Sequence, residues 1–72
     1  MSIAQRIKEL RIDRDLKQAE VAQIIGTTQQ YYGQYELEKR AIPAEQIAKL
    51  CKFYSVSADY VLGLPKGLSW PR

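Results

Sequence analysis

The stretch that decides the fold of this 72-residue chain is Gly26-Thr-Thr-Gln-Gln-Tyr-Tyr-Gly-Gln-Tyr-Glu36. Thr28 is a good N-cap, because its hydroxyl can accept a hydrogen bond from a backbone N–H in the first turn of a helix that begins at Gln29. Gly26 supplies the turn before this helix. Because an α-helix advances ~100° per residue, the helix has two distinct faces. One face carries Gln29, Gln30, Gly33 and Gln34, and the other carries Tyr31, Tyr32, Tyr35 and Glu36.

The glutamines of this amide face suggest a helix that reads DNA bases. A glutamine carboxamide carries two donors and an acceptor, so it can pair bidentately with N6 and N7 of adenine in the major groove. Glutamine is also an ordinary helix former on a solvated surface. This stretch alone does not decide between the two interpretations, so the rest of the chain has to.

Composition and charge restrict the kind of protein that this chain can form. Its length allows one small domain, and a content of 46% hydrophobic and 26% charged residues is globular. The net charge of +3 favours a polyanionic partner without proving one. No apolar run approaches the ~18 residues of a membrane span, and residues 1–10 are too polar for a signal peptide. We therefore expect a cytoplasmic protein.

The residues that most enzymes and metal sites require are scarce. The chain has no histidine, and its single cysteine, Cys51, cannot form an internal disulfide. This argues against metal clusters and against Ser-His or Cys-His catalysis. We expect no catalytic residues, no metal and no cofactor, and a protein that is not an enzyme.

Two more helices are predicted before the central stretch. Apolar residues recur at i, i+4 and i+7 in a helix from Ser2, its N-cap, to about Arg14. A second helix is expected over residues 18–25. Lys17 is a poor N-cap, so packing should hold the start of that helix, and Gly26 should end it in a left-handed conformation.

Arg11 lies four residues after Ile7 and therefore borders the buried stripe of the first helix. A guanidinium in this place either has an acidic partner or extends its charged head into water. The residues themselves leave both alternatives open.

Two short helices joined by a turn around Gly26 make a helix-turn-helix, whose second helix enters the major groove. Gln18 lies at the N-terminus of the first of them, where free N–H groups and the helix dipole attract phosphate. After the second, Lys39 and Arg40 lie within reach of a phosphate backbone. The alternative for these two residues is a solvated charged loop.

The C-terminal part of the chain predicts two further helices and a tail. The fourth helix begins with Pro43 at or near its first position, breaks between residues 53 and 56, and buries Cys51 as a small core residue. Ser57 caps a short fifth helix, which Gly63 closes. The chain thus divides into a domain over residues 1–63 and an apolar tail over residues 64–72, which we expect to pack on this domain or on a second copy.

These features together resemble the Cro and repressor helix-turn-helix family, also called XRE-type, of phage and bacterial regulators. The resemblance covers residues 2–63 and is closest to the lambdoid phage repressors. The motifs that carry it are Gln18-Ala-Glu-Val-Ala22, Gly26-Thr-Thr-Gln-Gln30, Gln34, Glu36, Lys39-Arg40 and Val56-Ser-Ala-Asp-Tyr-Val-Leu-Gly63. The resemblance implies an all-α fold: a compact five-helix lambda-repressor-like DNA-binding domain that contains a helix-turn-helix.

The function that the resemblance implies is that of a bacterial or phage-encoded transcriptional regulator. It would be a repressor that binds a palindromic operator in double-stranded DNA as a homodimer. By the same resemblance, Arg11 would pair with Glu36, and Tyr32 and Tyr35 would be core residues. The residues that would read bases are Gln29, Gln30 and Gln34. Those that would contact or approach the DNA backbone are Lys17, Gln18, Thr28, Tyr31, Lys39 and Arg40.

Several positions depart from the family pattern. Glu38 stands where the family usually has glycine, so the turn is either reshaped or strained by roughly 1 kcal/mol or more. Gly33 interrupts the reading helix on its base-facing side, where it either admits a close approach to a thymine methyl or sugar, the hypothesis we favour, or is unread. Lys17 and Leu37 replace polar residues that often touch phosphates. An alternative function is that of a DNA-binding antitoxin or interaction module whose tail, residues 64–70, binds a partner protein.

Overall fold

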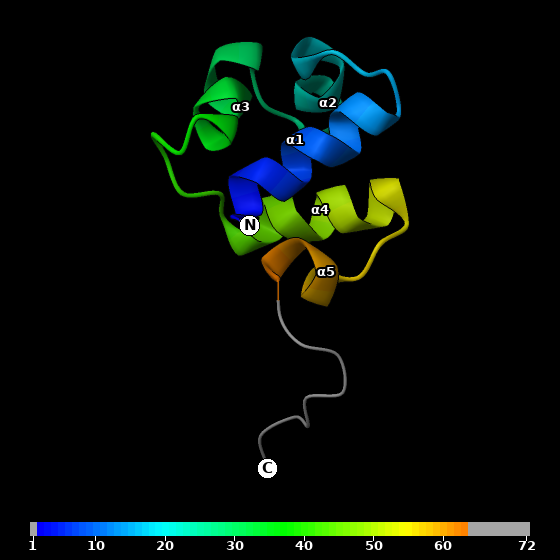
Figure 1. Cartoon of the computed structure of the whole chain (residues 1–72). Helices are drawn as coiled ribbons and strands as arrows, with labels where there is room; N and C mark the ends of the chain where they lie inside the picture. The colour runs from blue at the N-terminus through cyan, green and yellow to red at the C-terminus, as the bar shows by residue number, and fades with distance from the viewer. Residues whose placement is uncertain (1, 64–72) are drawn as a thin grey trace.

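The computed structural model of the protein describes residues 2–63, and these residues form five α-helices. The helices are α1 (Ile3–Asp13), α2 (Gln18–Ile25), α3 (Gln29–Glu36), α4 (Ala44–Tyr54) and α5 (Ala58–Leu62) (Figure 1). The predicted all-α, five-helix fold is confirmed. No helix in this range is long and apolar enough to span a bilayer. The predicted packing of the tail concerns residues outside those described.

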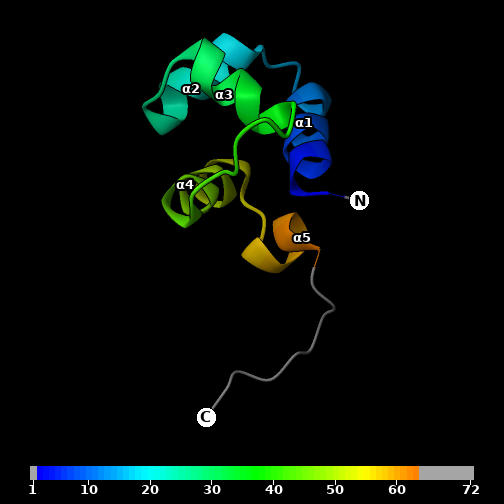
Figure 2. The same ribbon diagram turned by 90° about the vertical axis from the view of Figure 1, so that its left-hand side faces the viewer.

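The helices are arranged so that one side of α3 stays uncovered. Both views place α2 and α3 at one end of the domain and α5 at the other, with α1 and α4 between them (Figures 1 and 2). The helix α3 packs on α2 and on α1, while α4 packs on α2 and α5. The side of α3 that faces away from these neighbours is therefore open to solvent.

The hydrophobic core draws on all five helices. Its buried members are Ile7, Leu10, Val21, Ala22, Ile25, Tyr32, Tyr35, Ile47, Leu50, Tyr54 and Val61. Cys51 was predicted to be a small core residue. It is partly buried and packs against this cluster, so it lies at the edge of the core. Burial raises the pKa of the Cys51 thiol, which makes it a weaker nucleophile. The core also includes Tyr32 and Tyr35, two tyrosines that anchor α3 in it.

Helix starts follow the predicted caps with one addition. Ser2, Thr28 and Ser57 are N-caps, and each hydroxyl accepts a hydrogen bond from the backbone N–H three residues later, at 3.1 to 3.2 Å. The sequence predicted that packing holds the start of α2, and the structure adds a hydrogen bond there. The carboxylate of Glu20 accepts a hydrogen bond of 2.9 Å from the backbone N–H of Lys17, which satisfies a group at the helix end.

Helix ends show where the chain turns sharply. Gly26 ends α2 in the left-handed conformation, with φ of 78°, as predicted. The sequence predicted that α4 breaks between residues 53 and 56. In the structure the helix runs to Tyr54 and ends at Ser55, with φ of 57°, so the break begins later than predicted. Pro43 is the residue before the first turn of α4, beside the expected position. Its fixed φ suits this place as well.

Two basic side chains tie α4 to the first two helices. The guanidinium of Arg14 donates to the carbonyl of Tyr54 at 2.9 Å and lies over the ring of the same residue. Lys49 donates to the carbonyl of Ile25 at 3.3 Å, at the C-terminal end of α2. A cation at this end of a helix also interacts favourably with the helix dipole. The first contact joins α1 to α4, and the second joins the helix-turn-helix to α4.

Candidate nucleic-acid interface

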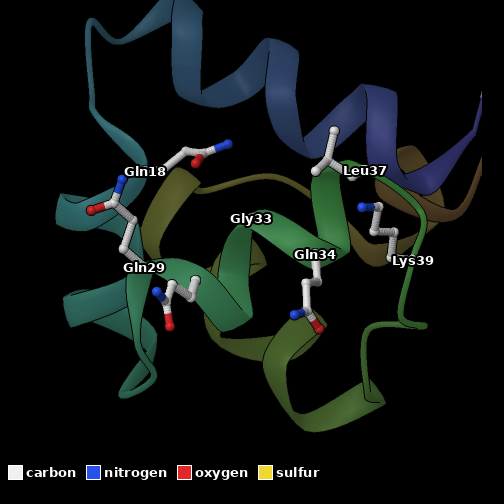
Figure 3. Close-up of a pocket in the computed structure, with 7 residues that line it drawn as sticks. Gln18, Gln29, Gly33, Gln34, Leu37 and Lys39 are labelled. Carbon is white, nitrogen blue, oxygen red and sulfur yellow. The ribbon is translucent and has the colours of Figure 1, made fainter.

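An open hollow on the uncovered side of α3 collects most of the predicted DNA-contacting residues (Figure 3). Its volume is about 410 Å³, and it is lined by Gln18, Gln29, Gln30, Gly33, Gln34, Leu37 and Lys39. The side chains of Gln29 and Gln30 are exposed, and Gln34 is half-buried. The amide face predicted from sequence is thus the solvent-facing side of α3.

The opposite side of α3 holds the helix in place. Tyr32 and Tyr35 are buried, and their rings meet edge to face with centroids 6.3 Å apart. Tyr31 is 41% exposed and lies edge-on to Tyr35, with ring centroids 5.8 Å apart. Packing of this kind restricts rotation of α3 about its own axis, so the amide face keeps a fixed direction.

An ion pair joins the end of α3 to α1. The guanidinium of Arg11 donates to both carboxylate oxygens of Glu36, at 2.8 and 3.0 Å, and to the carbonyl of Leu16 at 3.0 Å. The two paired side chains are 13% and 2% exposed. Of the two alternatives that the sequence left open for Arg11, the structure therefore contains the acidic partner, the one that the family resemblance also implied.

The environment of Glu36 keeps its carboxyl ionised. Burial alone would raise the pKa of this group, but hydrogen bonds that include those from Arg11 and Gln18 outweigh burial and lower the pKa below its usual value of 4.5. The hydrogen bond to Glu36 likewise raises the pKa of Arg11. Both partners are therefore charged at neutral pH.

Glu36 also fixes the orientation of Gln18. A carboxylate only accepts hydrogen bonds, so the amide nitrogen of Gln18 must face it, and the two groups lie 3.1 Å apart. The carbonyl oxygen of Gln18 then lies beside Gly33, where an added Cβ would stand 3.3 Å from it. The missing side chain at Gly33 therefore makes room for Gln18, a reason that the sequence did not reveal. The close approach of DNA to this glycine stays a hypothesis.

The loop after α3 folds back onto that helix. The backbone N–H groups of Lys39 and Arg40 both donate to the carbonyl of Gln34, at 3.0 and 3.3 Å. The turn passes through Glu38, with φ of 61°. The sequence left two alternatives for this turn, a reshaped one and a strained one. The structure contains the strained one, because Glu38 keeps a left-handed conformation. Lys39 consequently lies at the end of the hollow opposite Gln18 and Gln29 (Figure 3).

Arg40 takes a different direction from Lys39. Its guanidinium lies 4.5 Å from the ring centroid of Tyr31, and its Nε donates to Oε1 of Gln34 at 3.1 Å. Sequence reasoning missed this contact, because a pair six residues apart across a turn belongs to no helical or strand period.

The remaining predicted residues do not line the hollow. Lys17, Thr28, Tyr31 and Arg40 are all exposed, and the first two immediately precede α2 and α3. Leu37 does line the hollow and is 66% exposed. The sequence identified it only as a departure from the family pattern, because a single leucine after a helix does not reveal by itself that it is exposed.

The chain matches the profile of a known protein family, described as Helix-turn-helix, over residues 7–61. The chain belongs to the helix-turn-helix family. The family membership inferred from the sequence motifs is thereby confirmed, and the matched segment extends from the middle of α1 to α5.

Curated relatives of this helix-turn-helix protein include two bacterial and phage regulators. The uncharacterized HTH-type transcriptional regulator YobD of Bacillus subtilis is 38% identical over 60 residues, which are 83% of this chain and 54% of YobD. The cryptic phage CTXphi transcriptional repressor RstR of Vibrio cholerae is 43% identical over 51 residues, 71% of this chain and 46% of RstR. The chain spans about half the length of these curated relatives.

Solved structures confirm the fold of the helix-turn-helix domain. The P22 c2 repressor, solved in complex with a synthetic operator, superimposes with a TM-score of 0.79 at 24% identity, covering 86% of this chain and 94% of that one. The N-terminal DNA binding domain of SinR from Bacillus subtilis gives a TM-score of 0.74 at 24% identity, covering 92% and 96%. The lambda-repressor-like architecture expected from the sequence is therefore confirmed.

Proposed function

We propose that this protein is a sequence-specific DNA-binding transcriptional regulator, and that it represses by occupying an operator in double-stranded DNA. The observation that carries the proposal is the row of glutamine amides on the uncovered side of α3, whose back is anchored in the core by tyrosines. A helix presented in this way fits the major groove, which is ~12 Å wide. Occupying DNA requires no bond to be made or broken.

Base reading falls to the amides at the start and middle of α3. Gln29 and Gln30 stand in its first turn, where a docked recognition helix comes closest to base edges. Both side chains are exposed, so each amide is accessible and can pair bidentately with adenine. Gln34 and Gly33 lie about one turn further along and complete the reading surface.

Contacts to the DNA backbone would surround this reading surface. Lys17, Gln18 and Thr28 stand at the N-terminal ends of α2 and α3, where backbone N–H groups attract phosphate. Tyr31, Lys39 and Arg40 lie along α3 and in the loop that follows it. Such contacts fix the register of the protein on DNA, while the glutamines supply the sequence information.

The comparisons support this function. RstR is named a transcriptional repressor, and the P22 c2 repressor was solved on an operator. We propose that two copies of this chain bind a palindromic operator as a homodimer, with half-site centres about 34 Å apart on one DNA face. A regulator of this kind would work in the cytoplasm of a bacterium, with the gene carried by the bacterium or by a phage.

Selection from random DNA duplexes, with sizing of the complexes, tests the function directly. We expect an enriched motif of two inverted half-sites that contain adenines, bound by two copies of the chain. A replacement of Gln29, Gln30 and Gln34 together by alanine provides the control and should enrich no motif. Selection that enriches nothing with the unaltered chain would overturn sequence-specific binding.

A further inference from the structure

The three glutamines of α3 are not chemically equivalent. Within residues 2–63, no hydrogen bond involves the side-chain amide of Gln29 or Gln30, whereas the amide oxygen of Gln34 accepts a hydrogen bond of 3.1 Å from Nε of Arg40. A guanidinium donates and never accepts, so only the oxygen of Gln34 can face it. The chemistry of the pair therefore fixes which end of the Gln34 amide points away from Arg40. Figure 3 shows the nitrogen of Gln34 on the side toward Gln29.

Arg40 is itself held in place by contacts that do not involve DNA. Its guanidinium lies over the ring of Tyr31, 4.5 Å from the centroid, and Tyr31 leans edge-on against the buried ring of Tyr35. Stacking of this kind uses the planar shape of the guanidinium, which a lysine ammonium lacks. Arg40 is thus positioned before any DNA arrives.

Gln34 is also held by its backbone. Its carbonyl accepts hydrogen bonds from the N–H groups of both Lys39 and Arg40. The loop that carries Arg40 is therefore fixed relative to the same residue whose amide Arg40 contacts. Fixing a side chain in advance lowers the entropy lost on binding, and exclusion of water by DNA strengthens a hydrogen bond of this type.

An amide held in this orientation reads bases differently from a free one. Because its oxygen is directed toward Arg40, Gln34 turns its NH₂ group away from that residue, and an NH₂ group needs an acceptor. In the major groove guanine offers two acceptors, N7 and O6, and thymine offers O4, whereas cytosine offers the N4 donor. Adenine offers a donor beside its N7 acceptor and is a poorer match than guanine or thymine.

We propose that Arg40 is a positioning residue for Gln34, and that Gln34 therefore selects guanine or thymine over cytosine at its position in each half-site. This inference rests on the proposed function and adds the class of base that one residue recognises. It separates Gln34 from Gln29 and Gln30, whose free amides suit adenine.

The test uses the full chain and the motif obtained by random-duplex selection. A set of duplexes carries each of the four base pairs in turn at every half-site position, and Kd is measured for each. At one position we expect the unaltered chain to prefer guanine or thymine over cytosine by about tenfold or more. Gln34→Glu replaces the donor by an acceptor, so at that same position the preference should move to cytosine.

Two variants, one of Arg40 and one of Lys39, then separate the positioning of Gln34 from the effect of losing a positive charge. Arg40→Ala should weaken binding generally and also reduce the preference at the Gln34 position by about fivefold or more, leaving the positions read by Gln29 and Gln30 unchanged. Lys39→Ala removes the same charge from the same loop without touching the Gln34 side chain. It should weaken binding to all duplexes alike.

Three outcomes are informative in different ways. If selection enriches no motif, the proposed function fails and the inference fails with it. If a motif is enriched but Arg40→Ala behaves like Lys39→Ala, Arg40 acts only as a phosphate contact, and the inference is overturned while the function stands. A Gln34→Glu variant with unchanged base preferences at every position overturns it as well.

Discussion

The guanidinium of Arg11 and the carboxylate of Glu36 form a two-point ion pair, with Nε–Oε2 at 2.8 Å and Nη2–Oε1 at 3.0 Å. Because the Glu36 side chain is only 2% exposed, removing its partner leaves a buried charge uncompensated. We expect Arg11→Ala to lower the free energy of unfolding by about 2 to 4 kcal/mol, measured by urea denaturation. Arg11→Lys should recover only part of this loss, because an ammonium cannot form the two-point contact.

A matched control for this prediction is Lys8→Ala, which removes an exposed cation from the same helix. It should change the free energy of unfolding by less than about 0.5 kcal/mol. Equal effects of the two alanine variants would mean that the ion pair does not hold α1 to the end of α3.

The lowered pKa of Glu36 predicts a pH dependence with a definite sign. A carboxyl whose pKa is lower in the folded state stabilises the protein above its usual pKa of 4.5, and this contribution is lost as the pH falls through the folded value. We expect unaltered protein to be more stable than Glu36→Gln at pH 7, and the gap to shrink below about pH 4.5. Urea denaturation across this range measures the gap, and a gap that stays constant would argue against an ionised, paired Glu36.

The space beside Gly33 can be tested with a double-mutant cycle. Alanine in place of glycine inside a helix gains about 1 kcal/mol in propensity. In this protein the new Cβ would lie 3.3 Å from Oε1 of Gln18, so the side chain must move and its hydrogen bond to Glu36 weakens. Gly33→Ala should therefore stabilise the Gln18→Ala background by about 0.5 kcal/mol more than it stabilises the unaltered protein. Identical gains in both backgrounds would show that Gln18 does not need the room.

Much of this architecture follows from residues close together in the sequence. The caps at Ser2 and Thr28 and the buried stripes depend on side chains three or four positions apart, and a helical period specifies these directly. The contacts that shape the site depend on how distant segments meet. Gln18 beside Gly33, and Arg40 on Gln34, arise where two helices cross and where a loop folds back, and no local pattern encodes either geometry.

The turn after α3 stores a small amount of strain at Glu38. Its φ of 61° is left-handed, which costs a residue with a Cβ roughly 1 to 2 kcal/mol, whereas glycine adopts it freely but loses more entropy on folding. We expect Glu38→Gly to be more stable than Glu38→Ala by about 0.5 to 1 kcal/mol in urea denaturation. The alanine variant removes the same charge, so the difference reports the backbone alone. A glycine variant less stable than the alanine variant would mean that the turn is not strained.

Gln29 is proposed to read a base and Lys39 to contact the DNA backbone, and the two lie at opposite ends of the same hollow. Their alanine variants should therefore affect binding in different ways. Gln29→Ala removes a bidentate base contact, so it should cost about 1 to 3 kcal/mol on the selected motif and little on other sequences. Lys39→Ala removes a charge that responds to any phosphate, so it should weaken all sequences alike and reduce the salt dependence of log Kd by about one unit of slope. Binding titrations at several salt concentrations, on the motif and on a scrambled duplex, measure both effects. If Gln29→Ala weakened the two duplexes equally, the amide face would be a contact surface without a reading role.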